Sequence, residues 1–499
     1  MRRASLLSVL ALGVLLLSRG AAAHVGSPDA FFAGSAGNYP VRVTIRPPGV
    51  VPGLAEISVR VESSGVRRVT IRPVGYAAGP AGAPAPDLAT AVAGQPGLYS
   101  GALWLMSEGS YAIEISVEGE RGTGRTSVPI ASLPTRVLPM GRGLFVLVLA
   151  FAVSLVAGGL AIVFAAASES ALPPGEKPGP ARRRAAMHTT IAAGGVFLLL
   201  VFGEVAWSAR VRRSAERQVF RSYQTTARVR AEGAGRVMRL SIDDPAWKGA
   251  RWRPLVPDHG KLVHLFAMRE PALDAFAHLH PVAISERAFE APFPSLPGGT
   301  YSIFADVTDE TGLSQTLVAR TEVPAAAAGA ATALLASSRA DPDDSWRISP
   351  PLPPVVRQPL VSDLGGGLSM TWASASEAAP ILAGRELTLR FLVRDSGGRP
   401  AVLEPYMGMK GHAAVVRDDG SVFVHLHPMG TVSMASLDRL SGRHRSDSSE
   451  SHGTMNSASD PGGEVSFPYA FPKAGPYRLW VQVRSGEEVR TGVFDVLVR

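Results

Sequence analysis

The chain has 499 residues, 46% of them hydrophobic, so it is long enough for about three or four domains with sizeable cores. Lysine and arginine exceed aspartate and glutamate by 50 to 42, which gives a formal net charge of +8. These charges are scattered and flank apolar segments, and no basic stripe alternates with aromatic residues, which argues against a nucleic-acid partner. The absence of cysteine excludes disulfides, thiolate-ligated blue copper, covalent c-type haem and cysteine nucleophiles.

The start of the chain has the pattern of a secretory signal. A short basic region is followed by an apolar stretch, 6–17, and then by small residues at 21–23 that offer a cleavage site. We therefore predict that residues 1–23 are a signal peptide of an exported protein. Cleavage at this point would leave His24 as the first residue.

Residues 24–135 predict the first folded domain. The segments 41–45 and 57–61 alternate apolar and polar residues, as half-buried strands do. Proline and glycine clusters separate these and further short strands. This spacing predicts an immunoglobulin-like β-sandwich.

Two apolar segments follow this domain. Residues 143–168 include no charged residue and are long enough to cross a bilayer, whereas 185–209 is weaker because it holds His188 and Glu204. We predict two transmembrane helices, joined by a cytoplasmic loop over 169–184. An exported N-terminus and two crossings place the later residues outside the bacterial inner membrane, in the periplasm or at the cell exterior. The arginines after the second segment oppose this topology under the positive-inside rule.

The rest of the chain predicts two His-rich β domains. A transition segment, 210–250, precedes the first of them, 251–324. A linker rich in alanine and proline, 325–359, leads to the second, 360–499. The predicted fold class is therefore mainly β, with several sandwich domains and two transmembrane helices.

One histidine pattern occurs in both His-rich domains. When His264 and His412 are aligned, each copy has a donor residue five positions earlier and a His-Leu-His-Pro element 14 or 13 positions later. Residues two apart in a strand share a face and lie about 6.5–7 Å apart, so both rings of His-Leu-His can converge on one ion. The predicted ligands of the first copy are His264, His278 and His280, with His259 as an auxiliary. Those of the second copy are His412, His425 and His427, with Met407 and Met409 as auxiliaries.

Imidazole and thioether donors without thiolates favour copper. An all-imidazole set suits Cu(II) or Zn(II), and an added thioether favours Cu(I), so zinc stays an alternative. A free amino terminus at His24 would chelate Cu(II), with Asp29 as an oxygen donor. A polar insert, about 438–463, adds a weaker set of donors: His444, His452 and Met455. No acid–base pair at diagnostic spacing is present, and we expect no enzymatic activity.

The residues quoted above carry a family resemblance. His24 ahead of a small β-sandwich resembles the copper-resistance protein CopC, and the His-Leu-His-Pro segments resemble bacterial extracytoplasmic YtkA-like or CopC-like domains. The resemblance covers about 258–310 and 404–484, and more weakly 24–130. It implies β-sandwich folds and, for CopC, periplasmic copper binding. CopC-type sites need more ligands than Asp29 after the terminal histidine, and two helices between sandwiches are foreign to that pattern.

The sequence thus predicts a membrane-anchored extracytoplasmic protein that handles copper, for tolerance or for delivery to other copper-handling envelope proteins. The alternative is a metal-free interaction or assembly module of the cell envelope, in which the histidines only support the fold. A copper-dependent oxidase that uses His24 is a third hypothesis, and it requires a second histidine nearby.

Overall fold

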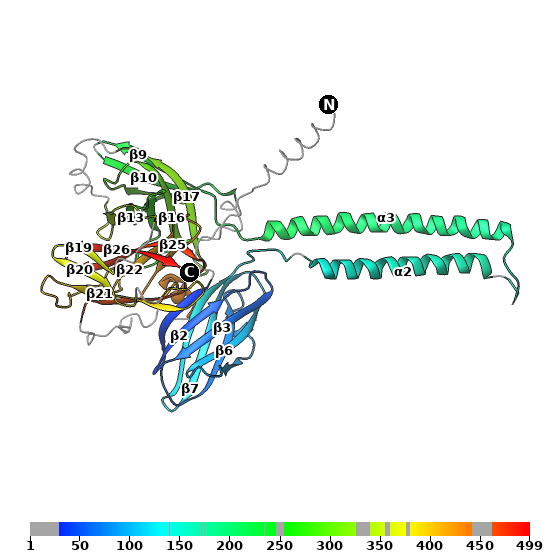
Figure 1. Cartoon of the computed structure of the whole chain (residues 1–499), viewed down its shortest axis with the longest axis horizontal. Helices are drawn as coiled ribbons and strands as arrows, with labels where there is room; N and C mark the ends of the chain where they lie inside the picture. Colours follow the sequence, from blue (N-terminus) through cyan, green and yellow to red (C-terminus); the bar gives the residue numbers. More distant parts are fainter. Residues whose placement is uncertain are drawn as a thin grey trace. The chain divides into compact units, whose positions relative to one another are not determined.

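A computed structural model of the chain describes residues 29–138, 140–170, 172–173, 175–233, 235–245, 254–325, 340–354, 360–375, 380–441 and 462–499. The predicted fold class is confirmed, because the protein is mainly β, with several β-sheets and two long apolar helices (Figure 1). The chain divides into two compact units. One holds the helices, 134–220, and the other holds three β domains, before residue 134 and after residue 220.

The N-terminal domain is a sandwich built from one folded sheet. Its strand order is β1-β2-β3-β6-β5-β4-β7-β8, so that β1, β2, β3 and β6 lie across a shared core from β4, β7 and β8. Alternating residues such as Val43 and Ile57 fill this core, as the period-two pattern predicts. The elements are β1 (Ala30–Ala36), β2 (Tyr39–Arg46), β3 (Gly53–Val61), β4 (Val66–Gly75), a 3-10 turn (Pro80–Gly82), β5 (Asp87–Ala91), β6 (Leu98–Leu105), β7 (Gly109–Gly119) and β8 (Gly122–Ser132).

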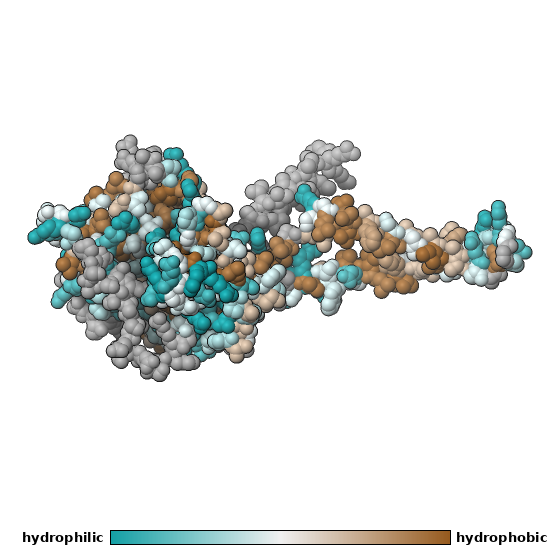
Figure 2. Space-filling model, turned by 90° about the horizontal axis from the view of Figure 1, so that it is seen from below, coloured by the Kyte–Doolittle hydropathy of each residue, from teal (hydrophilic) through white to brown (hydrophobic). Residues whose placement is uncertain are grey.

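The helical unit is a hairpin of α2 (Arg142–Glu169) and α3 (Pro180–Gln218). Both helices are long and apolar enough to cross a membrane. Hydrophobic residues cover much of the hairpin, and hydrophilic residues gather at its tip (Figure 2). Helix α3 extends beyond the predicted 185–209 at both ends, because proline is favourable at a helix start and the flanking arginines and alanines are good helix formers.

The first His-rich domain consists of two antiparallel sheets. One has the order β14-β15-β10-β9, and the other β11-β16-β12-β13-β18, with β17 paired to β16. Their inward residues form a single core. The strands are β9 (Thr225–Glu232), β10 (Gly235–Ile242), β11 (Leu255–Val256), β12 (His264–Arg269), β13 (Ala275–Leu279), β14 (Val282–Ser285), β15 (Ala288–Pro292), β16 (Gly299–Asp309), β17 (Ser314–Val323) and β18 (Ser345–Ile348).

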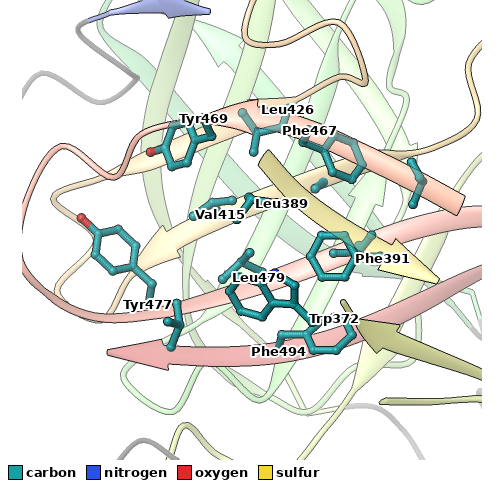
Figure 3. Packing of buried hydrophobic residues seen from close by; sticks show 14 of the residues in the cluster. Trp372, Leu389, Phe391, Val415, Leu426, Phe467, Tyr469, Tyr477, Leu479 and Phe494 are labelled. Carbon is teal, nitrogen blue, oxygen red and sulfur yellow. The ribbon is translucent and has the colours of Figure 1, made fainter. Parts of the chain in front are cut away.

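The second His-rich domain has the same two-sheet design. Its sheets have the orders β19-β20-β21-β24 and β23-β22-β25-β26. Trp372 and Phe391 from one sheet meet Leu479 and Phe494 from the other in its core (Figure 3). The elements are β19 (Val361–Gly365), β20 (Leu368–Trp372), β21 (Leu387–Arg394), β22 (His412–Arg417), β23 (Phe423–Leu426), α4 (Met434–Leu440), β24 (Glu464–Tyr469), β25 (Gly475–Ser485) and β26 (Glu488–Val498).

Two predicted connecting segments contribute strands to the first His-rich domain. The predicted transition segment, 210–250, holds the end of α3 and then β9 and β10, which pair with each other, and β10 also pairs with β15. The predicted linker, 325–359, holds β18, which extends the sheet at β13. The structured domain is therefore larger than 251–324.

Candidate metal centre

The two His-rich domains repeat each other in three dimensions. The order β17-β16-β12-β13 in the first domain matches β26-β25-β22-β23 in the second. The hydroxyl of Tyr301 donates to the carbonyl of Pro297 at 2.7 Å, and that of Tyr477 donates to the carbonyl of Lys473 at 2.8 Å. The repeat seen in the histidines is therefore a repeat of the whole domain.

Strand alternation places the histidines on the outer face of each sheet. In β12, Leu265 and Ala267 point into the domain core, so His264 and Phe266 point away from it. In β22, Ala413 belongs to the core of the second domain, which leaves His412 on the outer face. The same alternation directs His278 in β13 and His425 in β23 outward.

These two outer faces pack against each other. Phe304 stacks on Phe423 with ring centroids 4.3 Å apart, and Phe276 stacks on Trp480 at 4.8 Å. Phe304 is equivalent to Trp480 in the repeat, and Phe276 to Phe423, by their strand pairing. Exchanging the two His-rich domains therefore converts one aromatic stack into the other. This is the pattern of a pseudo-twofold interface.

Seven histidines gather at one end of this interface. They are His259, His264, His278, His280, His412, His425 and His427. Ring centroids in contact lie between 4.4 Å, for His425 and His427, and 6.4 Å, for His278 and His412. The copies that the sequence suggested as two sites thus form a single cluster at the domain boundary.

Two triads within the cluster could each hold an ion, since their ligand nitrogens lie within 4.8 Å of one another. Site A consists of His264, His278 and His280, all from the first His-rich domain. Site B consists of His259 from the first domain with His412 and His427 from the second. His259 thus forms a triad with histidines of the other repeat.

Outer hydrogen-bond partners fix the tautomers of several rings. His278 Nδ1 lies 2.9 Å from Gln482 Oε1, His280 Nδ1 lies 3.0 Å from Asp344 Oδ1, and His427 Nδ1 lies 3.2 Å from the carbonyl of Val432. These oxygens accept, so each Nδ1 carries the proton and each Nε2 has a free lone pair. Histidine ligands of metals usually have such an outer acceptor.

The ring of His264 has the opposite tautomer. Its Nε2 donates to the carbonyl of Asp258 at 3.1 Å, so its Nδ1 keeps a lone pair. That Nδ1 lies 3.3 Å from His278 Nε2, which also has a lone pair. Two acceptors cannot form a hydrogen bond, but the separation matches the roughly 3.3 Å between two nitrogens on one tetrahedral ion with bonds of about 2.05 Å.

Other buried nitrogens of the cluster have no hydrogen-bond partner. Among the described residues these are Nε2 of His259, His280, His425 and His427, and both ring nitrogens of His412. An unsatisfied buried polar atom costs about 1–3 kcal/mol, so a concentration of them needs an explanation. A bound cation would use these lone pairs, and the donor set fits a transition metal.

Burial favours the neutral form of five of the seven rings. Burial lowers the pKa of His264, His278, His412 and His427 well below the ordinary value, and neighbouring imidazoles act in the same direction. Burial also lowers the pKa of His259. Neutral imidazole is the form that binds metals, so the lone pairs are available at neutral pH.

A third group, His280 with Asp341 and Asp344, is close enough to hold an ion. One of its carboxylates already has a cationic partner, because the ammonium of Lys261 lies 2.6 Å from Asp341. We regard these carboxylates as outer support for His280.

The remaining predicted ligands lie outside the two triads or outside the described residues. Met407 and Met409 flank a half-buried turn, and Tyr406 beside them packs edge-on to His412 at 5.0 Å. His24, His444, His452 and Met455 lie outside the described residues. Sequence reasoning missed the outer partners Gln482 and Asp344, since nothing local marks them.

Comparisons with known proteins leave the activity open. A domain of unknown function, DUF8832, matches residues 366–499. No curated protein matches. Solved structures with 9–10% identity include PorU from Porphyromonas gingivalis (TM-score 0.14), a putative membrane anchored protein from Corynebacterium diphtheriae (0.15) and Salmonella alpha-2-macroglobulin (0.14). The alignments cover 95%, 94% and 92% of this chain, and 34%, 96% and 22% of those chains. The family match thus relates residues 366–499 to a domain of unknown function.

Proposed function

We propose that this protein binds copper in the histidine cluster between its two His-rich domains and handles the metal at the bacterial cell membrane, for tolerance or for delivery to other envelope proteins. The observation that carries the proposal is that two nitrogen atoms, His264 Nδ1 and His278 Nε2, lie 3.3 Å apart although each has a lone pair and no proton. A cation between them replaces a repulsion with two bonds.

The donor chemistry supports copper, with zinc as the competitor. The seven rings supply imidazole nitrogens as donors, and the chain has no cysteine to supply thiolates. Imidazole suits both Cu(II) and Zn(II), and thioethers such as those of Met407 and Met409, which share a turn with Tyr406, favour Cu(I).

The helical hairpin supports a membrane anchor. Helices α2 and α3 have the length and hydropathy of membrane spans. The signal-like start and two crossings would place the β domains outside the cell membrane. The burial of the histidines fits a chain that holds its metal securely.

A second candidate is a metal-free interaction module of the cell envelope. It is favoured by large apolar side chains on the surface of the N-terminal domain, where Leu54 and Trp104 are cross-strand neighbours with exposed fractions of 49% and 57%. Exposed apolar patches mark interaction surfaces when they are contiguous.

Metal uptake by the full chain in detergent micelles separates the two candidates. The protein is dialysed against Cu(I), Cu(II) or Zn(II), and bound metal and melting temperature are measured. The control variant replaces His278, His280, His425 and His427 with alanine. Metal binding with a raised melting temperature, lost in the variant, supports the proposal. A folded wild-type chain that takes up no metal contradicts it and leaves the interaction module.

A further inference from the structure

We propose that the cluster is a two-ion centre, in which site A binds one ion inside the first His-rich domain and site B binds a second ion that clamps the two His-rich domains together. This inference rests on the metal binding proposed above, but it makes separate predictions about stoichiometry and about the domain boundary.

The number and grouping of the donors favour two ions. Sites A and B each contribute three imidazoles and share no residue. A four-coordinate ion has no room for seven rings. His425 lies between the sites, with ring centroids 5.4 Å from His264 and 5.3 Å from His412, and its Nε2 has no hydrogen-bond partner among the described residues. It is therefore available to complete either ion.

Site B joins elements of both domains. His259 lies in a turn of the first domain that is closed by hydrogen bonds between Asp258 and Lys261. His412 begins β22, and His427 follows β23, both in the second domain. The carboxylate of Asp258 also accepts from the backbone N–H of Ala435 at 3.1 Å, in α4 of the second domain. An ion at site B would therefore fix a boundary that already meets at this turn.

The pseudo-twofold axis makes the two sites chemically unlike. Met407 is the counterpart of His259: both have φ of 50°, each precedes a glycine with φ near 78°, and each lies in a turn closed by a short backbone bridge. When the two His-rich domains are exchanged, the residues equivalent to His259, His412 and His427 of site B are Met407, His264 and His280. By this symmetry the thioether of Met407 would face the ion of site A and favour Cu(I) there, while all-imidazole site B suits Cu(II) or Zn(II).

Matched single substitutions separate the sites. In His280→Asn and His427→Asn the new amide can still donate to Asp344 or to the carbonyl of Val432, but the inward-facing Nε2 is removed. We expect about two equivalents of copper in the wild-type chain, one in each single variant and none in the double variant. Full chains in detergent are titrated, and bound metal is counted after gel filtration.

The clamp is tested by hydrogen exchange. In His280→Asn, metal should slow exchange in both 258–261 and 426–432, because site B is intact. In His427→Asn, metal should leave exchange in 426–432 unchanged. Met407→Leu should weaken Cu(I) binding at least about tenfold and leave Zn(II) binding unchanged.

The possible results separate the two-ion centre from the proposed function. A wild-type titration that saturates at one equivalent overturns the two-ion centre, and so does the loss of all binding in either single variant, while the proposed function survives. If the wild-type chain binds no metal, the proposed function fails. If a variant does not fold, the wild-type stoichiometry still decides.

Discussion

Equivalent histidines in the two repeats meet unlike partners across the interface. His278 Nδ1 lies 2.9 Å from Gln482 Oε1, whereas His425 Nδ1 lies 3.4 Å from Asp306 Oδ2. The amide oxygen of Gln482 accepts a hydrogen bond from His278, whereas the carboxylate of Asp306 places a negative charge beside His425. The repeats are thus alike in geometry and different in electrostatics.

Substitution of Asp344, the outer hydrogen-bond partner of His280, tests whether this acceptor supports metal binding. Asp344 Oδ1 accepts from the backbone N–H and from Nδ1 of His280, at 2.8 and 3.0 Å. Asp344→Ala leaves the ring without its acceptor, and we expect copper affinity to fall by about 10–100-fold and stability by about 1–3 kcal/mol. Asp344→Asn keeps one acceptor oxygen and should lose less. Equal copper affinity in wild type and Asp344→Ala, measured by competition with a chelator, would refute this role.

The buried rings also predict how stability depends on pH in the metal-free chain. Burial lowers the pKa of His264, His412 and His427 in the folded state, so below about pH 6.5 the unfolded state binds more protons than the native state. The stability contributed by the neutral rings is complete above that pH and is lost as pH falls, by up to about 1.4 kcal/mol per pH unit and per ring.

Urea unfolding of the metal-free chain at pH 7.5, 6.0 and 5.0 measures this dependence. His264→Gln and His412→Gln should each reduce the slope. A free energy of unfolding that stays constant from pH 7.5 to 5.0 would show that the rings are not buried as neutral groups.

Among the secondary-structure elements, strands within the predicted domains were easier to predict than the segments that connect these domains. Alternation located β2 and β3, and the matched histidine spacing revealed the repeat. The strands β9 and β10 also alternate, with Val229 and Leu240 in the core, but they follow directly on a membrane-length helix and were assigned to a transition. The pairing of β10 with β15 depends on contacts distant in the chain, which local patterns do not encode.

The merging of the two histidine copies could not be predicted from local signals. Spacing shows that His278 and His280 share a face, but not that this face meets the second domain. The decisive contacts are long-range, such as Phe276 on Trp480. The repeat therefore pointed to the histidines, and the interface determined which of them meet.

The aromatic stack supplies a test of this interface. Phe423→Ala removes the ring that stacks on Phe304 at 4.3 Å, and we expect a loss of about 3–5 kcal/mol in stability. Weaker docking should also lower the affinity of site B, by about tenfold for each 1.4 kcal/mol lost from domain association. Phe289→Ala, in the core of the first His-rich domain, is the matched control and should lower stability only. Equal copper affinity in both variants would contradict the coupling.

At the scale of the whole molecule, the N-terminal domain holds the segment that follows His427. The backbone N–H of Ala33 in β1 donates to the carbonyl of Met429 at 2.8 Å, and that of Thr431 donates to the carbonyl of Phe31 at 3.0 Å. Phe31 enters the core of the second His-rich domain, and Val432 enters the core of the N-terminal domain. All three β domains therefore meet beside site B, so we expect metal binding at the proposed centre and the domain assembly to depend on each other.

Gly430 provides the test of this junction. It has φ of 120°, and a Cβ there would lie 1.9 Å from the carbonyl oxygen of Phe31. Gly430→Ala should cost more than about 2 kcal/mol and loosen β1, because backbone must move. Gly420→Ala is the control, since its φ is 68° with open space around it, and it should cost about 1 kcal/mol. Equal losses in thermal unfolding would show that β1 is not held at this point.

The most direct test of a buried histidine metal centre is X-ray absorption spectroscopy at the copper edge, on the full chain loaded in detergent micelles. We expect scattering dominated by imidazole rings, with a sulfur contribution in Cu(I)-loaded protein that is lost in Met407→Leu. A first shell of oxygen donors without imidazole scattering would mean that copper binds elsewhere, and it would contradict the assignment of this cluster as the metal centre.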